Sequence, residues 1–304
     1  MNLEPPIDVS VVIVSWNTRA LTTACVASLP DAAGPLAWDV WVIDNASTDG
    51  SVDALRAAHP AAHVVANETN VGFAAANNQG ISASTGRYVL LLNSDTVMAP
   101  GSLRLLVAFA DAHPAAGVVG PMLLNPDGSF QSGPTPFPSL WTEGLSATGI
   151  GRRLTFKGYP SRGPGASVTA QSTGYVVGAC MLARRQAIDD VGLLDEGYFM
   201  YSEEPDWCWR MRTKGWETWY TPEARVTHFG GQSTRQVRSA MNIALHRSKV
   251  RFFRRHRGTW SAACLAGLFM AVSAVRSVVR AALRLDPPGV RLTRADLWVD
   301  RRRP

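Results

Sequence analysis

The hydrophobic and polar positions of the first 120 residues follow two alternating patterns. Short apolar runs rich in β-branched residues predict strands buried on both faces, and the stretches between them have helical spacing. The predicted strands are residues 9–14, 38–43, 63–66, 88–92 and 117–119, and the predicted helices are residues 18–29, 51–58, 72–84 and 102–112. This alternation predicts an α/β fold with a mostly parallel sheet flanked by helices.

Polar side chains follow three of the predicted strands directly. They are Ser15 and Asn17 after the first strand, Asp44 and Asn45 after the second, and Asn93 and Asp95 after the fourth. Open α/β sheets bind their ligands at the carboxyl ends of the strands. We therefore expect these side chains to meet at one site.

The chain is less regular in its middle. Residues 125–170 are rich in Gly, Pro and Ser and predict a long excursion with little regular structure. Regular structure is expected again over residues 174–183. A further helix is expected to begin near Pro205, with Glu204 close to its N-cap, and to end before Gly215.

The C-terminal part differs from the rest in charge. Residues 239–304 carry 14 Lys and Arg against 3 Asp and Glu, whereas residues 1–238 carry 16 against 21. Residues 239–256 predict a basic helix and residues 260–275 are apolar and uncharged, a run shorter than the roughly 20 residues of a spanning helix. We expect an amphipathic helix or helical hairpin on an anionic membrane surface. A membrane span and a helix packed on the globular domain stay open as alternatives.

Composition narrows the function classes. With 304 residues, 46% of them hydrophobic, the chain can form one large or two modest domains. Four scattered cysteines without a Cys-x-x-Cys pair predict neither a zinc site nor a disulfide framework, and they fit a reducing compartment. The N-terminus lacks the basic and apolar pattern of a secretory signal. Because the excess of bases is confined to one segment, we expect no nucleic-acid partner.

Three carboxylates lie within four positions, at Glu203, Glu204 and Asp206. The start of a helix favours their ionised forms, whereas their mutual repulsion opposes ionisation. Aromatic side chains surround the cluster in the sequence, which argues against a simply solvated helix end; they are Tyr198, Phe199, Tyr201, Trp207 and Trp209. An ionised carboxylate that reaches a hydroxyl can act as a general base.

Three other residues are candidates for ligand contacts. Asp95, at the exit of a buried strand, is placed to hold Mg²⁺ or Mn²⁺, which take oxygen ligands and share them with substrate phosphates. His228, near a predicted strand end, is a candidate nitrogen ligand or phosphate partner, although a lone histidine is often structural. Asp44 is either a turn former or an acceptor for a base or ribose.

Seven motifs occur together in one order along the chain. They are Val14-Ser-Trp-Asn17, Val42-Ile-Asp-Asn-Ala-Ser-Thr-Asp-Gly-Ser51, Asn70-Val-Gly-Phe-Ala-Ala-Ala-Asn-Asn-Gln-Gly80, Leu92-Asn-Ser-Asp95, Gly178-Ala-Cys-Met181, Phe199-Met-Tyr-Ser-Glu-Glu-Pro-Asp206 and Thr227-His228. Over residues 8–235 the chain resembles the family-2 glycosyltransferases of the GT-A fold, and within them the rhamnosyltransferase-like branch. The resemblance implies a catalytic domain over residues 1–238, followed by a helical, membrane-associating extension over residues 239–304.

The resemblance also implies roles for single residues in an inverting, metal-dependent transfer. Asp95 and His228 would serve the divalent cation, and Glu204 would be the base. Glu-Glu-Pro-Asp departs from the usual Glu-Asp-x-Asp, which leaves Glu203 and Asp206 open as the base. Asn93-Ser-Asp95 replaces Asp-x-Asp, which leaves one charged metal ligand. The implied nucleotide-sugar contacts are Ser15, Trp16, Asn17, Asp44, Asn45, Asn70, Gly72, Phe73, Asn77, Asn93, Ser94, Gly178 and Ala179.

The expected donor is dTDP-rhamnose; a UDP-linked hexose, galactofuranose or N-acetylhexosamine stays open. The expected acceptor is a glycan or polyprenyl-linked glycan at the cytoplasmic face of the membrane, and an oligomer stays open. A nucleotidyltransferase would need a basic phosphate loop near the N-terminus, where residues 15–21 offer only Arg19. A silent sugar-binding scaffold would be expected to lack Asp95, the acidic cluster or His228, and the chain has all of them.

Overall fold

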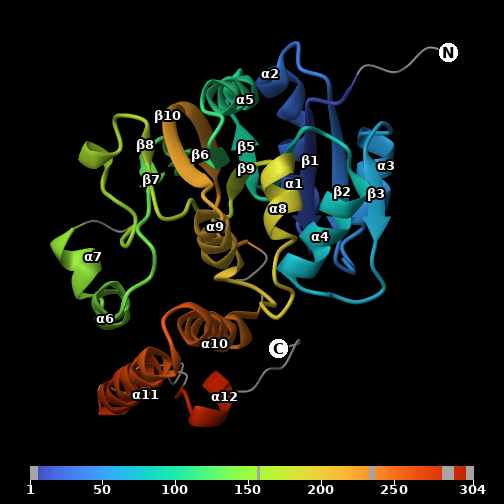
Figure 1. The fold of residues 1–304 in the computed structure, drawn as a ribbon. Helices are drawn as coiled ribbons and strands as arrows, with labels where there is room; N and C mark the ends of the chain where they lie inside the picture. Colours follow the sequence, from blue (N-terminus) through green and yellow to red (C-terminus); the bar gives the residue numbers. More distant parts are fainter. Residues whose placement is uncertain (1–5, 156–157, 233–236, 283–290, 299–304) are drawn as a thin grey trace.

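The computed structural model describes residues 6–155, 158–232, 237–282 and 291–298. One ten-stranded sheet forms its centre, and helices lie on both faces (Figure 1). The strand order is β3-β2-β1-β4-β9-β6-β10-β5, with β7 paired to β6 and β8 to β10. The strands are β1 (Val9–Ser15), β2 (Trp38–Asp44), β3 (His63–Ala66), β4 (Tyr88–Asn93), β5 (Thr96–Met98), β6 (Ala116–Leu124), β7 (Phe130–Ser132), β8 (Gln171–Ser172), β9 (Cys180–Arg184) and β10 (Glu217–His228).

The predicted α/β class is confirmed, and the sheet is parallel mainly in its N-terminal half. Strands β3, β2, β1 and β4 run parallel, β9 runs antiparallel to both β4 and β6, and β10 is parallel to β6. Ser15 therefore pairs in register with Asp44, and Val14 with Asn93. Because β10 runs in the same direction as β1 and β4, its last residue, His228, reaches the same edge of the sheet.

Two apolar cores lie on opposite faces of the sheet, as the alternation of strand side chains requires. Val11 and Ile13 of β1 face the core that contains Cys25, Leu29 and Leu103, whereas Val12 faces the other core. The first core is covered by α1 (Arg19–Ala27), α2 (Leu29–Ala33), α3 (Ser51–Ala58) and α5 (Ser102–Ala112), and the second by α4 (Phe73–Ala83), α8 (Arg185–Val191) and α9 (Glu203–Thr213).

Three predictions about local structure were wrong. The single helix over residues 18–29 is two helices, α1 and α2, because Pro30 has no N–H to continue the first one. The excursion contains β7, α6 (Leu140–Thr148), α7 (Ile150–Leu154) and the 3₁₀ helix η1 (Pro164–Ala166). Helix α6 begins at a capping box formed by Ser139 and Thr142. Helix α9 begins at Glu203, two residues before Pro205, since proline is tolerated in a first turn.

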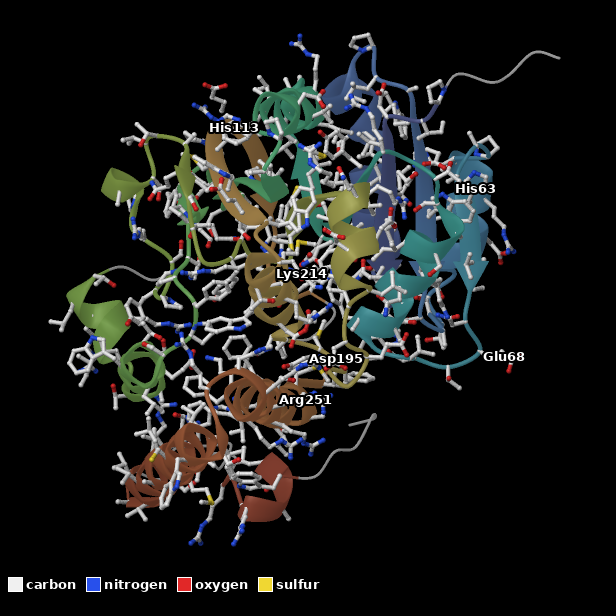
Figure 2. All side chains as sticks on the ribbon, in the orientation of Figure 1. His63, Glu68, His113, Asp195, Lys214 and Arg251 are labelled. Carbon is white, nitrogen blue, oxygen red and sulfur yellow. The ribbon has the colours of Figure 1, made fainter. Side chains whose placement is uncertain are left out.

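The C-terminal helix α10 (Arg238–His256) packs on the part of the chain that forms the sheet. Its Phe252 and Phe253 are buried in the same core as Val12 of the sheet. Arg251 Nη2 lies 3.0 Å from the carboxylate of Asp195, and Figure 2 labels the two residues next to each other. Part of the basic charge therefore pairs with acidic residues of the same chain, and the division at residue 238 stays a prediction.

Helix α11 (Thr259–Ala282) follows α10, and α12 (Arg294–Trp298) lies beside them (Figure 1). Within the described residues, Thr259–Arg280 is the one helical stretch whose length and apolar composition would allow it to cross a membrane. It is longer than the predicted apolar run because the helix continues through Arg276 and Arg280. Leu265 and Phe269 are buried, so one face of α11 packs on the protein.

Candidate active site

A cavity of about 430 Å³ opens at the carboxyl ends of β1, β2 and β4. Its volume falls in the range of small-molecule sites. Eight residues implied by the resemblance line it: Trp16, Asn45, Asn70, Gly72, Phe73, Asn93, Ser94 and Asp95. The lining residues that the residue-by-residue prediction missed are Val14, Phe199, Met200, Gly231, Gln232, Val237, Ala240 and Met241.

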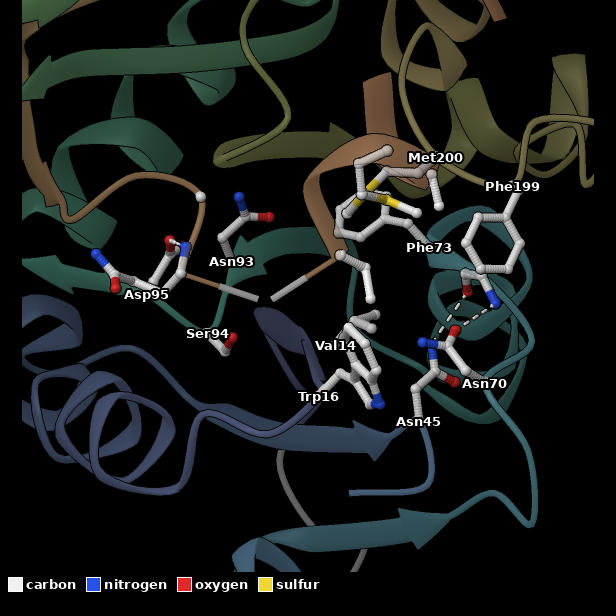
Figure 3. A pocket seen from close by; sticks show the side chains of 16 residues that line it. Val14, Trp16, Asn45, Asn70, Phe73, Asn93, Ser94, Asp95, Phe199 and Met200 are labelled. Carbon is white, nitrogen blue, oxygen red and sulfur yellow. Dashed lines mark hydrogen bonds between the residues drawn. The ribbon is translucent and has the colours of Figure 1, made fainter. Parts of the chain in front are cut away.

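The cavity has two chemically different ends (Figure 3). Asn93, Ser94 and Asp95 lie on one side, and Asn70 and Phe199 lie on the other. The first side offers oxygen ligands and hydrogen-bond partners, which suit phosphates and a cation. The second offers an aromatic face and an amide, which suit a planar base.

Two implied nucleotide contacts lie behind the cavity wall. Asp44 is 1% exposed, and its Oδ1 accepts a hydrogen bond of 2.8 Å from the backbone N–H of Ser47, as its turn-forming interpretation predicted. Its Oδ2 is buried and has no hydrogen-bond partner among the described residues. Asn17 accepts a hydrogen bond of 2.8 Å from the backbone N–H of Thr48 and so joins the loops after β1 and β2.

Other implied contacts also support the wall from outside. Ser15 is fully buried, and its hydroxyl lies 3.0 Å from that of Thr22. Asn77 is 1% exposed and donates to the carbonyl of Phe73 at 2.9 Å. The carbonyl of Ala179 accepts from the backbone N–H of Asn93 at 3.0 Å, which ties the start of β9 to the end of β4.

The loop before α9 is held against the start of α4. The backbone N–H of Phe73 donates to the carbonyl of Phe199 at 2.7 Å. Gly72 has a φ of +91°, and a Cβ there would lie 2.7 Å from the Phe199 ring, so only glycine fits. Tyr201 and Ser202 both have positive φ, a costly backbone conformation that is common at functional sites. This conformation sets the direction in which α9 begins.

The three carboxylates at the start of α9 have different surroundings. Glu203 is only 4% exposed, and burial together with the charge of Glu204 raises its pKa well above the usual value. Glu204 is partly exposed, but its Oε2 is buried, and this burial raises its pKa too. Against that, the backbone N–H of Gly178 and the ammonium of Lys249 favour the charged form of Glu204. Of this adjacent pair, Glu204 is therefore the carboxylate that ionises more readily.

Lys249 of α10 is held near Glu204 by a second carboxylate. Its Nζ donates a hydrogen bond of 2.6 Å to Oε2 of Glu143, which is 2% exposed and lies on α6. Glu204 also influences the half-buried Tyr175 and the buried Cys208, whose pKa values are raised mainly by loss of hydration and further by the Glu204 charge. The base candidate thus lies in a buried charge cluster built from the excursion, α9 and α10.

Asp206 is fully buried and has charged partners of its own. Its Oδ2 accepts from Arg210 Nε at 2.8 Å, and its Oδ1 accepts from His256 Nε2 at 2.7 Å. Burial acts to raise the pKa of Asp206, but these partners outweigh it and lower the pKa. The surroundings of Asp206 favour a role in joining α9 to α10 and do not favour a role as the base.

The residues proposed as metal ligands lie next to each other at the cavity. Oδ1 of Asp95 lies 3.3 Å from Nε2 of His228, and that nitrogen is buried without a hydrogen bond among the described residues. The side-chain amide of Gln131 donates to the carbonyl of His228 at 2.8 Å, so its oxygen faces Nδ1 at 2.7 Å. In the neutral imidazole Nδ1 therefore carries the proton, and the lone pair of Nε2 is free for a ligand.

These donors fit a divalent cation that is shared with a substrate. Besides the carboxylate of Asp95 and the imidazole of His228, the cavity wall contains Asn93, whose Oδ1 is another buried atom without a partner among the described residues. The described residues contain no group of three His, Cys, Asp or Glu side chains that could hold a metal ion. The remaining ligands would have to come from water and the substrate's phosphates, as is usual for Mg²⁺.

Sequence reasoning missed three supporting residues because they lie far from the motifs. Gln131 is in the excursion, and Lys249 and Met241 are in the C-terminal segment. Each contacts the site only through the tertiary fold. The composition of those segments, rich in polar and basic residues, does not indicate which residues of the site these three side chains contact.

Comparisons with known proteins agree with the fold and indicate a family. The sequence model described as "Glycosyl transferase family 2" matches residues 10–192. An "N-acetylglucosaminyl-diphospho-decaprenol L-rhamnosyltransferase" of Mycobacterium tuberculosis is 32% identical over 243 residues, which are 73% of this chain and 77% of that protein.

Solved structures show the same fold at low sequence identity. A mannosyltransferase from Pyrobaculum calidifontis, in complex with GDP-Man and Mn²⁺, has a TM-score of 0.54 and 17% identity over 92% of this chain and 79% of that chain. GalNAc-T7 with UDP, GalNAc and Mn²⁺ has a TM-score of 0.51 and 17% identity; the match covers 74% of this chain and 44% of that chain. Given the family match and this fold, the chain belongs to glycosyltransferase family 2, with a GT-A fold and a rhamnosyltransferase-like sequence.

Proposed function

We propose that the protein is an inverting, metal-dependent transferase that moves a sugar from a nucleoside diphosphate to a hydroxyl of a glycan or lipid-linked glycan. The observation that carries this proposal is the cavity at the carboxyl ends of the strands, with Asp95 in its wall and His228 beside it. Glu204, at the start of α9, approaches the segment 178–179, which is bonded to Asn93 of that wall.

The two ends of the cavity suggest how the donor lies. The base and ribose would occupy the side of Asn70 and Phe199, and the diphosphate would lie beside Asn93 and Asp95. The Oδ2 of Asp44 is buried, so it would contact the base or ribose only after a small rearrangement of the wall. A bound Mg²⁺ or Mn²⁺ would offset the charge of the leaving diphosphate; Asp95, His228 and Asn93 are the residues that would hold it.

The residues of the chain then have distinct roles in the reaction. Glu204 takes the proton of the acceptor hydroxyl as the oxygen forms a bond to the anomeric carbon. The bond from that carbon to the diphosphate breaks on the opposite face, so one displacement inverts the configuration. Glu203, whose pKa burial and the charge of Glu204 raise well above its usual value, takes up a proton more readily than Glu204 and so limits the charge beside it. Gln131 keeps the imidazole of His228 in one orientation.

The similarity to the Mycobacterium tuberculosis L-rhamnosyltransferase supports a rhamnose donor and a polyprenyl-diphosphate acceptor. We therefore propose dTDP-rhamnose as the donor, with UDP-linked hexoses, galactofuranose and N-acetylhexosamines as alternatives. We also propose that the enzyme works at the cytoplasmic face of the membrane, because a lipid-linked acceptor would be presented there. An oligomer stays a prediction without structural support.

A screen of nucleotide sugars tests this function. We expect one donor to bind or hydrolyse measurably only with Mg²⁺ or Mn²⁺, and we expect chelation to abolish the effect. In Asp95→Asn the enhancement of donor binding or hydrolysis by the metal should fall by at least about a hundredfold, because the variant lacks the charged ligand. Calorimetry measures donor binding, and a coupled nucleotide-release assay measures donor hydrolysis. Equal binding with and without metal would count against the metal role.

The pH dependence of transfer tests whether Lys249 controls the base. Glu204 is active when deprotonated, so the acidic limb of kcat/KM reports its pKa. Removal of the Lys249 charge in Lys249→Met should raise that pKa further and move the limb to higher pH. Glu143→Gln leaves Lys249 uncompensated and should move the limb to lower pH. The double variant, which removes both charges, should lie between them.

The opposite directions of these shifts separate electrostatics from damage to the fold. A merely structural role of the Glu143–Lys249 pair would lower the rate without moving the limb, or would move it the same way in both variants. Nucleotide binding at each pH serves as the control for folding.

A further inference from the structure

Helix α11 presents an apolar stripe to solvent on the side opposite its buried face. Exposed residues recur every three or four positions along it: Trp260, Cys264, Gly267, Ala271, Val275 and Val278. Trp260 is 86% exposed and Val278 is 68% exposed. Residues at this spacing share one face of a helix. A helix that is apolar on both faces is expected to be covered on both.

The excursion adds two short helices to this exposed apolar surface. Trp141 of α6 is 75% exposed, and Leu154 of α7 is 76% exposed. Helix α6 contacts both α7 and α11, and Arg276 of α11 donates to the carbonyl of Ala147 at 2.5 Å. In Figure 1 the three helices lie at the same end of the molecule, away from the outer strands β2 and β3. The two tryptophans therefore belong to one end of the fold, although they are far apart in the sequence.

The charges of these three helices are of one sign at the surface. Arg152 and Arg153 of α7 and Arg276 of α11 are exposed. The single carboxylate in α6, α7 and α11 is Glu143, which is buried and paired with Lys249. Apolar side chains with tryptophan, rimmed by arginine and without exposed carboxylates, match the interface of an anionic bilayer.

We propose that α6, α7 and α11 together form a lipid-docking surface that binds an anionic membrane through Trp141 and Trp260. The sequence pattern assigned membrane contact to the C-terminal segment alone; the structure adds the excursion to it. The inference deepens the proposed function and rests on it only in that the acceptor would be lipid-linked. Glu143 belongs to α6 and pairs with Lys249, so the surface is connected to the base through one ion pair.

Two other occupants fit the surface less well. If α11 crossed the bilayer, Leu265 and Phe269 would have to leave the core that they share with α10, including the contact of Phe269 with the ring of His246 at 4.6 Å. A second copy of the chain would bring the same arginines together across a two-fold axis, and like charges there would repel. The bilayer is the occupant for which both the apolar and the basic side chains have partners.

Flotation of the full-length protein with vesicles tests the proposal. One set contains phosphatidylglycerol and phosphatidylcholine in equal parts, and the other contains phosphatidylcholine alone. We expect binding to the anionic vesicles, and we expect Trp141→Ser/Trp260→Ser to weaken it at least about tenfold. Arg152→Gln/Arg153→Gln should weaken binding to anionic vesicles about tenfold and leave binding to neutral ones unchanged.

A matched control is Val168→Ser, since Val168 is 69% exposed but lies outside the three helices. It should bind like the unaltered protein, and nucleotide binding should report folding in every variant. The proposal is overturned if the tryptophan variant floats as well as the control, or if flotation resists high salt and alkali as a spanning helix would. It is also overturned if the protein stays off vesicles and light scattering shows a dimer.

Flotation requires neither donor nor acceptor. A protein that binds vesicles through the tryptophans but transfers no sugar would reject the proposed function and leave the docking surface standing. A protein that transfers sugar to a soluble acceptor but does not bind vesicles would support the proposed function and reject the docking surface.

Discussion

Glu204→Gln is expected to lower sugar transfer by about a hundred- to ten-thousand-fold, the range for loss of a general base. The amide has nearly the same shape but cannot accept the acceptor's proton. Donor binding should stay within about twofold, because Glu204 is not among the residues that line the cavity. A donor–acceptor assay and calorimetry on the same preparation measure the two effects. Full turnover in this variant would reject Glu204 as the base.

Glu203→Gln is the matched control for that experiment. Glu203 is 4% exposed and its pKa is raised well above the usual value, so its surroundings favour the neutral acid that an amide mimics. We expect it to keep most of the transfer activity. If Glu203→Gln were inactive and Glu204→Gln active, the roles of the two carboxylates would have to be exchanged.

Asp206→Ala is expected to have the largest effect on stability, a loss of about 3–5 kcal/mol in the free energy of unfolding. The change removes a fully buried carboxylate and leaves Arg210 and His256 without their shared partner. It also removes the hydrogen bond through which Asp206 of α9 holds His256 of α10. Urea denaturation at neutral pH measures the loss, and Asp189→Ala, at an exposed position of α8, should change stability by less than about 0.5 kcal/mol.

The pH dependence gives a second readout of Asp206. Its pKa is lowered in the folded state, so its contribution is present above the unfolded pKa of about 3.9. That contribution is lost as the pH falls through the lower folded pKa. The unaltered protein should therefore lose stability over this acidic range more steeply than Asp206→Ala. A loss below about 1 kcal/mol at neutral pH would mean that the connection between α9 and α10 does not depend on Asp206.

The two experiments separate the parts of the acidic cluster. Glu204 is expected to affect the reaction and leave the fold unchanged, whereas Asp206 is expected to affect the fold first. The cluster therefore combines a chemical group and a structural one within a single helical turn. Helix α10 serves both, through Lys249 near Glu204 and His256 on Asp206.

The sequence by itself determined the α/β class and most helices and strands of the first 120 residues. Apolar periodicity differs between helices and strands, and that difference is local in the chain. It also predicted that Asp44 and Asn93 would gather at one edge, because strands that run in the same direction bring their carboxyl ends together. That His228 reaches the same edge follows from the direction of β10 in the sheet. The order of the seven motifs indicated the family by resemblance.

Only the tertiary structure shows how the surroundings of the three carboxylates differ, on which the proposal of Glu204 as the base rests, and what the C-terminal segment contacts. The partners that distinguish Glu204 from Asp206 are Lys249 and His256, more than 40 residues away in the chain. Burial and long-range pairing set the pKa of each carboxylate, and neither leaves a local pattern. The basic segment predicted a membrane surface, but Lys249 and Arg251 of α10 form ion pairs within the protein. The exposed tryptophans lie on α6 and α11, which folding brings to the same end of the molecule.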